Sequence, residues 1–486
     1  MIQPFIRRLL IVGSIVMLDH PVAIAQIIPD NSLNTEGSQL VNNVTIKGEI
    51  GDRINGGAIR GNNLFHSFQD FNVADGQRLF LRTDVDIQNI LTRVTGSNPS
   101  NILGTLGVEG AANLFLLNPN GILFGQNARL DLGGSFLATT ANALQFGEQG
   151  VFSTADRQAP PLLTVNPSAL WFNQLQASSI VNRSQTPLGT TPNGIPLRGL
   201  QVPQGQSLVL AGGAINFEGG GVNALGGRID LAAIASPNRA GVPNIVGLAT
   251  DGNEIKLNVP TEARGDVTFT NGAIANVASG NGGAIVVSAR NLTLINARLR
   301  AGIEENAGAI DSQAGDIVLN VTEQVLAQQS VLANIVRSGG LGNAGNLQIQ
   351  TGSLLLSRGT QLFTDTSGTG NAGNIVVEAR DRIVLQGADS DEFLSLMNSG
   401  IKEGGRGNGG NIRLTTDSLS LTQGTQLISS VSGQGNGGDV ILKARDITFW
   451  EARPMGMAAL TLVEFLRRWR RRGRAMRGRF ASILKR

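Results

Sequence analysis

The chain has 486 residues, of which 64 are Gly and only 15% are Asp, Glu, Lys or Arg. A hydrophobic content of 41% is too high for a disordered chain, so this much Gly indicates a β-rich fold with closely spaced turns. The absence of Cys excludes disulfides, thiolate nucleophiles and thiolate metal sites.

The net charge of +3 is unevenly distributed along the chain. Residues 451–486 hold ten Arg and one Lys against two Glu, a local charge of +9, which leaves −6 (+3 minus +9) for the rest. The body of the chain is therefore mildly acidic, and we expect no nucleic acid among its partners.

The first 25 residues have the pattern of a secretory signal peptide. Two Arg residues precede an apolar run over 9–18, and small residues at 23–25 predict cleavage after Ala25. An uncleaved anchor is the alternative, but Asp19 and His20 make the end of the run polar. We therefore expect the mature chain to be soluble outside the cytoplasm.

Residues 26–180 contain short stretches in which apolar and polar residues alternate, such as 44–50 and 78–82. A period of two is typical of strands with one buried face, and the Asn-Gly and Gly-Gly pairs between them predict turns. Residues 181–207 are richer in Pro, Thr, Gly and Gln, and we expect them to form a linker or loop.

A repeat runs through residues 208–450. Each copy has a Gly pair or an Ala-Gly pair, then a polar residue and an apolar strand, and one or two further strands follow. The second Gly of the clearest copies lies at 283, 315, 345, 373, 410 and 438. Three short strands per coil of about 30 residues, stacked so that neighbouring coils bury a continuous core, define a solenoid. We therefore predict an all-β fold, a right-handed parallel β-helix with a capped N-terminal domain.

Few residues carry catalytic or metal-binding chemistry. Two matches to the dinucleotide-binding pattern, at 368–373 and 433–438, precede β-branched strands instead of helices, so we interpret them as turns of the repeat. His66 is the only His outside the predicted signal peptide, and a single His is too little for a catalytic triad or a His-based metal site. The acidic cluster 389–392 is interpreted as a solvated loop. We expect no catalytic residue, cofactor or metal.

Residues 26–172 resemble the filamentous haemagglutinin N-terminal domain, the secretion domain of two-partner secretion exoproteins, in the style of cyanobacterial members. The resemblance is carried by Gln26–Asp30, Gly61–Phe68, Phe71–Val73, Asn89–Gly96 and Ala112–Gly125. Its most specific mark is Asn118-Pro119-Asn120-Gly121-Ile122. This motif also predicts a tight turn, because Pro fixes φ and Asn-Gly tolerates positive φ.

The resemblance implies a secretion domain over residues 26–180 that is recognised by the periplasmic domains of a dedicated outer-membrane transporter. It thereby implies that the chain passes through the periplasm and is secreted or displayed at the cell surface. It implies an adhesin or haemagglutinin, with glycans or surface proteins of host or neighbouring cells as ligands, or a toxic role in some members. The candidate secretion-motif residues are Asn63, Phe65, His66, Asn118, Pro119, Asn120, Gly121 and Ile122.

Residues 451–486 depart from this pattern, and the sequence leaves three interpretations open: a frameshifted or truncated reading frame, a basic amphipathic helix at anionic surfaces, or a disordered tail. Two other functions are alternatives to the adhesin. A β-helical polysaccharide-degrading enzyme would need carboxylates grouped on one face. The passenger of a self-transporting adhesin would need a C-terminal membrane barrel, which we do not expect in this tail.

Overall fold

The computed structural model describes residues 26–156, 158–191, 194–239, 241–252, 254–387 and 394–450. The predicted signal peptide with its cleavage site at Ala25, the tail 451–486 and the acidic cluster 389–392 lie outside the described residues. Within the described ranges, no helix is long and apolar enough to cross a membrane.

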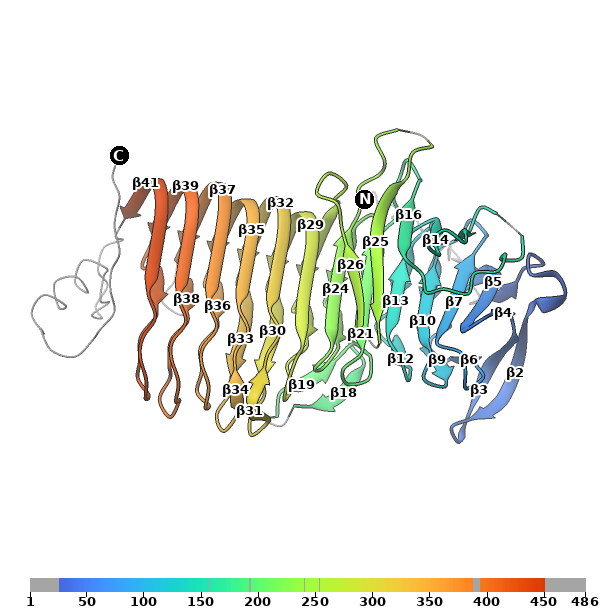
Figure 1. Ribbon diagram of the computed structural model, residues 1–486, viewed down its shortest axis with the longest axis horizontal. Coiled ribbons are helices and arrows are strands. Elements are labelled where there is room, and N and C mark those ends of the chain that lie inside the picture. The colour runs from blue at the N-terminus through green and yellow to red at the C-terminus, as the bar shows by residue number, and fades with distance from the viewer. Residues whose placement is uncertain are drawn as a thin grey trace, which may run out of the picture.

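The chain winds into an elongated solenoid of stacked β-strands (Figure 1). Successive strands of one coil lie on different faces, and each pairs in parallel with the corresponding strand of the next coil. The predicted right-handed parallel β-helix with a capped N-terminal domain is confirmed. It forms because alternate residues of each strand point inward, where apolar side chains of neighbouring coils meet.

The first face of the solenoid carries a strand from every coil. In order, these are β5 (Asn63–Phe71), β7 (Asn89–Val94), β10 (Asn113–Leu117), β13 (Phe136–Thr139), β21 (Ser207–Gly212), β24 (Arg228–Ala233), β29 (Ala284–Ile295), β32 (Ile317–Gln328), β35 (Leu347–Ser357), β37 (Ile375–Gln386), β39 (Ile412–Thr422) and β41 (Val440–Trp450). From β29 on, each strand is long enough to bend onto the second face.

The second and third faces complete the coils. The earlier coils place β8 (Ser100–Ile102), β11 (Ile122–Phe124), β17 (Ile180–Asn182), β22 (Ile215–Glu218) and β27 (Asp266–Thr270) on the second face. The third face begins with β6 (Arg78–Arg82), β9 (Thr105–Glu109) and β12 (Arg129–Asp131). It continues with β20 (Leu200–Gln201), β23 (Gly221–Asn223), β28 (Ile274–Asn276), β30 (Arg298–Ile303), β33 (Val331–Val336), β36 (Gln361–Phe363), β38 (Leu396–Asn398) and β40 (Gln426–Ile428). Strands β31 (Gly308–Gln313) and β34 (Leu341–Asn343), which come after β30 and β33 in the chain, form a separate short parallel pair.

The segment 181–207, expected as a linker or loop, lies within the solenoid. Strand β17 pairs with β11 and β22, and β20 pairs with β23. Between them, β18 (Pro187–Thr190) and β19 (Pro196–Arg198) form an antiparallel pair. The coil continues because Leu200 and Val202 are buried in the same core as the strands on either side.

The core inside the solenoid is one continuous column of Leu, Ile, Val, Ala and Phe side chains. Register partners in adjacent coils stack directly: the rings of Phe217 in β22 and Phe269 in β27 lie parallel with centroids 4.1 Å apart. Polar ladders run beside the core. Asn374 accepts a hydrogen bond from the backbone N of Asn411 and donates one to Asn346. From Asp316 to Asp439, the Asn or Asp after the second Gly of one repeat bonds in this way to the same position of the next coil.

The N-terminal end of the solenoid is closed by antiparallel strands. The free edge of β5 pairs with β1 (Ile27–Pro29) and with β4 (Ala58–Arg60). The hairpin of β2 (Ser38–Ile46) and β3 (Glu49–Gly56) adds to the third face through β6, and a short 3-10 turn, η1 (Asn34–Glu36), precedes it. Covering the first coil removes an open edge that would otherwise pair with other chains.

A second sheet lies outside the first face. It consists of β15 (Val151–Ser153), β14 (Ala143–Gln145), β16 (Ala169–Phe172), β25 (Asn244–Asp251) and β26 (Glu254–Asn258), in that order. Beneath it is a second core, which takes up the outward-pointing Phe65, Leu91, Phe115, Leu137 and Val209, all register neighbours along the first face. In the part of the chain that the structure describes, no second sheet covers the outward positions of the first face from β29 on.

Candidate functional site: the Asn-Pro-Asn-Gly corner and the clamped loop

The Asn-Pro-Asn-Gly motif forms the corner between β10 and β11. The backbone N of Gly121 donates to the carbonyl of Asn118 at 3.2 Å, which closes a four-residue turn. The side chain of Asn118 accepts a hydrogen bond from the backbone N of Asn120 at 3.0 Å. Gly121 has φ of 115°, a conformation that favours Gly, so the residue types are set by the turn itself.

This corner is stacked on the corresponding corner of the preceding coil. Asn118 donates to the carbonyl of Asn98 at 3.0 Å and to the hydroxyl of Ser100 at 2.9 Å, and Asn120 donates to the carbonyl of Gly96 at 2.9 Å. Beside it is a polar hollow lined by Gln69, Asp70, Thr95, Gly96, Ser97 and Asn98. The motif therefore joins two coils at one edge of the solenoid.

Little of the motif is available to a partner once the domain is folded. Asn118 is fully buried, Pro119, Gly121 and Ile122 are buried as well, and only Asn120 is partly exposed. In the folded state, the Asn118 and Asn120 side chains form hydrogen bonds to the preceding coil. A partner could contact this corner at Asn120 and at the polar hollow.

The other candidates, Asn63, Phe65 and His66, lie on β5 and are also buried. Phe65 packs against Phe152 in the second core, with ring centroids 4.9 Å apart. Asn63 begins an amide ladder in which Asn89 donates to Asn63 at 3.0 Å and Asn113 donates to Asn89 at 3.1 Å. These residues thus hold neighbouring coils and the outer sheet together.

His66 has an apolar and nearly closed environment. Its Nδ1 lies 2.9 Å from the hydroxyl of Ser38, and its Nε2 has no hydrogen-bond partner among the described residues. Burial lowers the pKa of His66 from 6.5 to about 3, because the charged imidazolium would lose its hydration without gaining a counter-ion. His66 is therefore neutral at physiological pH and packs as part of the cap.

One loop of the outer sheet, residues 158–166, is held against the cap by side chains; we call it the clamped loop. Asn63 donates to the carbonyls of Leu163 and Val165 at 2.9 and 2.8 Å. Asn89 donates to the side-chain oxygen of Asn166 at 3.0 Å. Two of the segments that carry the family resemblance therefore place their Asn side chains on a loop about 75 to 100 residues further along the chain.

A buried cation that was not among the predicted site residues completes this clamp. Arg93 in β7 is 1% exposed and donates to the carbonyls of Ser153 and Gln158 at 2.7 and 2.8 Å. It also donates to the hydroxyls of Ser32 and Ser67, and its guanidinium lies over the ring of Phe152. Burial lowers the pKa of Arg93 to about 10, opposed by nearby carboxylates. The sequence signal for its burial was its place two residues after Leu91 and two before Thr95, on the same side of a segment that has no other charged residue.

Asp30 supplies the negative charge closest to this network. Its carboxylate accepts hydrogen bonds from Ser32, Ser67 and Thr95. Burial raises the pKa of Asp30, but these hydrogen bonds outweigh it and hold that pKa below its usual value. Asp30 thereby joins the segment after β1 to β5 and to Thr95 at the end of β7, and through Ser32 and Arg93 to the clamped loop.

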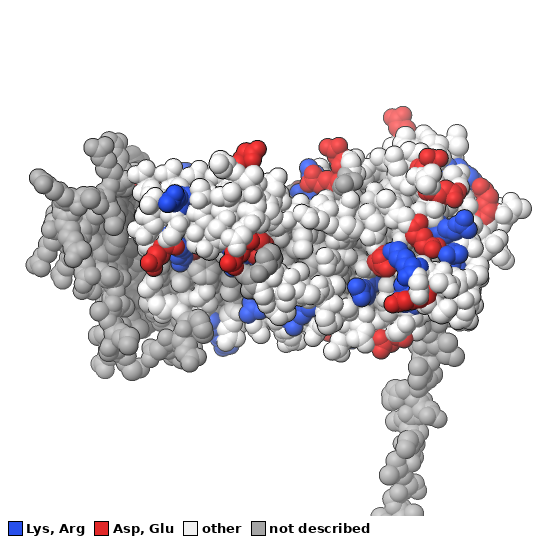
Figure 2. All heavy atoms as spheres, turned by 90° about the horizontal axis from the view of Figure 1, so that it is seen from below, with Lys and Arg blue, Asp and Glu red and all other residues white. Residues whose placement is uncertain are grey.

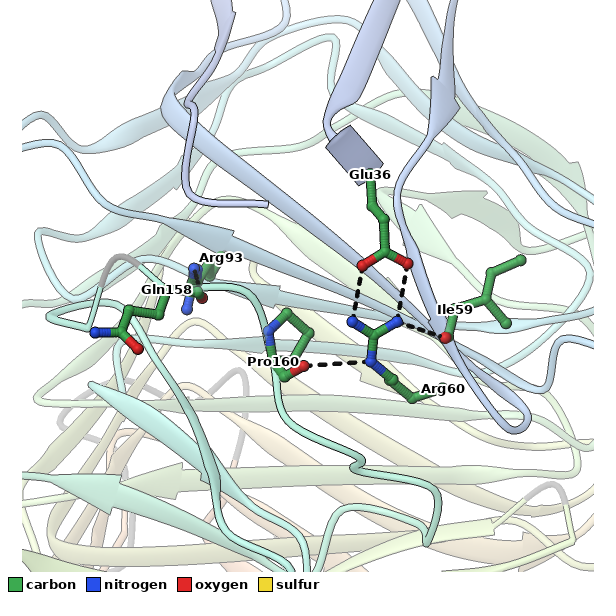
Figure 3. A network of polar contacts seen from close by, with 6 residues as sticks. All are labelled: Glu36, Ile59, Arg60, Arg93, Gln158 and Pro160. Atoms are coloured by element: carbon green, nitrogen blue, oxygen red, sulfur yellow. Dashed lines mark hydrogen bonds and ion pairs between the residues drawn. The ribbon is translucent and has the colours of Figure 1, made fainter. Parts of the chain in front are cut away.

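A second arginine clamps the loop from the side of the cap. Figure 3 shows Arg60 between the carboxylate of Glu36 and main-chain oxygens. The guanidinium donates to both oxygens of Glu36 at 2.9 and 2.8 Å, to the carbonyl of Pro160 at 3.2 Å and to that of Ile59 at 2.8 Å. This pairing raises the pKa of Arg60.

In the described part of the chain, no group of three or more His, Cys, Asp or Glu could hold a metal ion.

The fold and this site describe a capped β-helical domain with an outer sheet clamped to its first coils. The sequence profile of the TPS secretion domain matches residues 25–287. Among solved structures, the HMW1 secretion domain from Haemophilus influenzae is 16% identical with a TM-score of 0.52, and the match covers 85% of this chain and 99% of that one. The filamentous hemagglutinin secretion domain is 15% identical with a TM-score of 0.33, covering 86% and 99%. No match was found among curated proteins.

The chain belongs to the family of the TPS secretion domain, since the profile match spans more than half of it. The chain is therefore an exoprotein of a two-partner system, exported through the periplasm to the cell surface or the medium. Its partner in export is the outer-membrane transporter of that system.

Proposed function

We propose that this exoprotein is an adhesin that binds glycans or surface proteins of host or neighbouring cells and has no catalytic activity. The observation that carries the proposal is the long solenoid beyond β29, where no sheet among the described residues covers the outward side of the first face. An extended stack of coils presents a large surface at a distance from the cap, as repeat proteins that bind partners do.

We also propose that the secretion domain extends beyond residue 180, to the first long strand. The outer sheet ends with β26, and the match to the family profile ends at residue 287 within β29. Residues beyond this point form coils that differ from the earlier ones in having one continuous strand for two faces. These coils would be the adhesive part of the chain.

We propose that the Asn-Pro-Asn-Gly corner supports export by allowing the first coils to fold, with the periplasmic domains of the transporter contacting the domain around it. The burial of Asn118 and its bonds to the preceding coil support this interpretation. A motif that served only as a contact in the folded state would be expected to present its side chains to solvent.

The export test expresses the full chain with and without its transporter and measures the chain in the culture medium. The replacement Asn118-Pro119-Asn120→Ala-Ala-Ala should abolish transporter-dependent appearance in the medium, whereas Asn127→Ala, at an exposed Asn of the same coil, should leave it unchanged. Unimpaired export of the triple variant would contradict the role of this corner.

The adhesion test compares cells that do or do not display the exported chain, in binding to other cells and to arrays of glycans. We expect binding that depends on the chain and that is lost when the coils after residue 287 are removed. Equal binding by cells without the chain would contradict the adhesin proposal while leaving the export result untouched.

A further inference from the structure

The polar hollow beside the Asn-Pro-Asn-Gly corner lies where the corners of three successive coils meet. Its lining comes from the end of β5 and from the turn after β7, and the corner after β10 borders it. The backbone N of Gly96 donates to the carbonyl of Gln69 at 3.1 Å, and the side chain of Asn120 donates to the carbonyl of Gly96 at 2.9 Å. Four of the segments that carry the family resemblance thus converge on one hollow of about 340 Å³.

The hollow is open because the turn after β7 begins with small residues. Gly96 lies so close to the preceding coil that a Cβ atom on it would be 2.2 Å from the carbonyl oxygen of Gln69. Ser97 follows with a short, exposed side chain, and neither residue fills the space above the turn. The corresponding corner of the next coil has Pro119 and Asn120 instead. Since Gln69 and Ser97 are both exposed, a partner can reach the lining from solvent.

Asp70 gives the hollow a negative charge. It is the only ionisable residue of the lining, and its side chain is partly exposed. Its Oδ1 accepts a hydrogen bond from the side chain of Asn98 at 2.8 Å, whereas its Oδ2 accepts none from a described residue. The hollow therefore offers a partner one accessible carboxylate oxygen, surrounded by polar groups.

The cations of the cap do not neutralise Asp70. At the end of the solenoid that carries the cap, Lys and Arg side chains lie next to Asp and Glu (Figure 2). Four ion pairs of the cap are Lys47–Asp131, Arg53–Glu109, Arg60–Glu36 and Arg78–Glu49. Arg82 and Arg129 lie on the third face, whereas the hollow is at the edge between the first and second faces. The buried Arg93 is offset by Asp30. Within the described ranges, Asp70 thus has no ion-pair partner.

We propose that this hollow receives a Lys or Arg side chain from the periplasmic domains of the transporter, and that Asp70 forms the ion pair with it. A hydrogen bond between two ionised groups is about twice as strong as one between neutral groups, so a single such contact gives both affinity and register. The proposal rests on the proposed role of the Asn-Pro-Asn-Gly corner in export, because Asn120 holds the turn that forms the hollow. It deepens that role by naming the residue that is recognised and the charge of its partner.

The experiment measures binding of the full chain, purified from the periplasm of cells that lack the transporter, to the complete transporter in detergent micelles. Export into the medium is measured in parallel in cells that have the transporter. We expect the binding to weaken as salt is raised, because the contact is an ion pair open to solvent. Binding that is equally tight at low and high salt would overturn the proposed ionic contact.

Two variants of Asp70 test its charge. Asp70→Asn keeps an oxygen that Asn98 can bind, so it should unfold at the same denaturant concentration as the unchanged chain and raise the dissociation constant roughly tenfold. Asp70→Lys should abolish binding and export. Asp75 is the matched control, since it is an exposed carboxylate outside the hollow that accepts hydrogen bonds from Asn127. Asp75→Asn should behave as the unchanged chain does. Unaltered binding by Asp70→Asn, or an equal loss in Asp75→Asn, would overturn the proposal.

The result is distinguishable from the test of the corner. Export that is lost in the Asn118-Pro119-Asn120 variant but retained in Asp70→Lys would leave the corner's role in folding in place and refute the hollow as a docking site. Weaker binding by a folded Asp70→Asn, together with normal export of the triple variant, would establish the contact at the hollow and refute the role of the corner.

Discussion

Asn120 in the corner of one coil donates a hydrogen bond of 2.9 Å to the carbonyl of Gly96 in the corner of the preceding coil. The bond joins two turns that are separated by 24 residues in the chain but lie one above the other in the solenoid. It gives the family motif a physical role, because each corner of a β-helix can only be held by the corners next to it.

The two Asn residues of this corner should differ in their effect on stability. Asn118→Ala leaves the partly buried carbonyl of Asn98 and the buried hydroxyl of Ser100 without this donor and removes the acceptor for the backbone N of Asn120, so we expect a loss of about 2–3 kcal/mol in the free energy of unfolding. Asn120→Ala breaks two part-buried contacts, to the carbonyl of Gly96 and to the side chain of Asn118, at a partly exposed residue, and should cost about 1 kcal/mol. Denaturant titration of both variants, beside Asn127→Ala, measures this. An equal cost for the two would argue against the buried role of Asn118.

Removal of the buried cation should release the clamped loop. Arg93→Met leaves the carbonyls of Ser153 and Gln158 without donors and Asp30 without its nearby cation, so we expect destabilisation of roughly 3 kcal/mol. Limited proteolysis should then cut within residues 158–166, whereas we expect this loop to be protected in the unchanged chain. Arg82→Met, at an exposed arginine of β6, serves as the control. Continued protection of the loop in Arg93→Met would show that its other contacts suffice.

His66 should make the cap less stable in mild acid. Its folded-state pKa of about 3 lies below its usual value of 6.5, so the unfolded chain takes up a proton that the folded chain refuses. The stability from neutral His66 is complete above pH 6.5 and falls by about 1.4 kcal/mol per pH unit below it. Between pH 6.5 and pH 5 the loss is therefore about 2 kcal/mol.

The measurement compares unfolding at pH 7 and pH 5 in the unchanged chain and in His66→Asn, whose side chain can still reach the hydroxyl of Ser38. The variant should lack most of the acid-dependent loss, because the cluster around Asp30 titrates at lower pH. The same pH dependence in both proteins would mean that another group is responsible.

The Asn ladder of the repeats should stabilise the coils on both of its sides. Asn374→Ala removes the donor to Asn346 and the acceptor for Asn411, so we expect local destabilisation of about 1–2 kcal/mol. Hydrogen exchange should become faster in β37 and β39, while β5 and β7 in the cap stay unchanged. Asn436→Ala, whose exposed side chain makes a single contact in its ladder, is the control and should have a smaller effect.

The repeated Gly–Asn pattern by itself determined that the chain is a parallel β-helix, and the signal was strong because every coil must bury apolar residues and turn at the same places. The segments that resemble the secretion domain likewise determined the family. Residues 181–207 were harder to interpret, since their Pro and Gly content is that of a loop although Leu200 and Val202 are buried. Composition cannot show that irregular strands are supported by coils on either side.

Only the tertiary structure decided what the motif residues do. Asn63 and Asn89 bind main-chain and side-chain oxygens of residues 163–166, about 75 to 100 positions away, and no local pattern encodes a partner at that distance. Arg93 was not among the residues that the sequence singled out, but the outer sheet folds over it and makes it a buried donor to two carbonyls. Periodicity fixes which way a side chain points, whereas burial depends on which other segment comes to cover it.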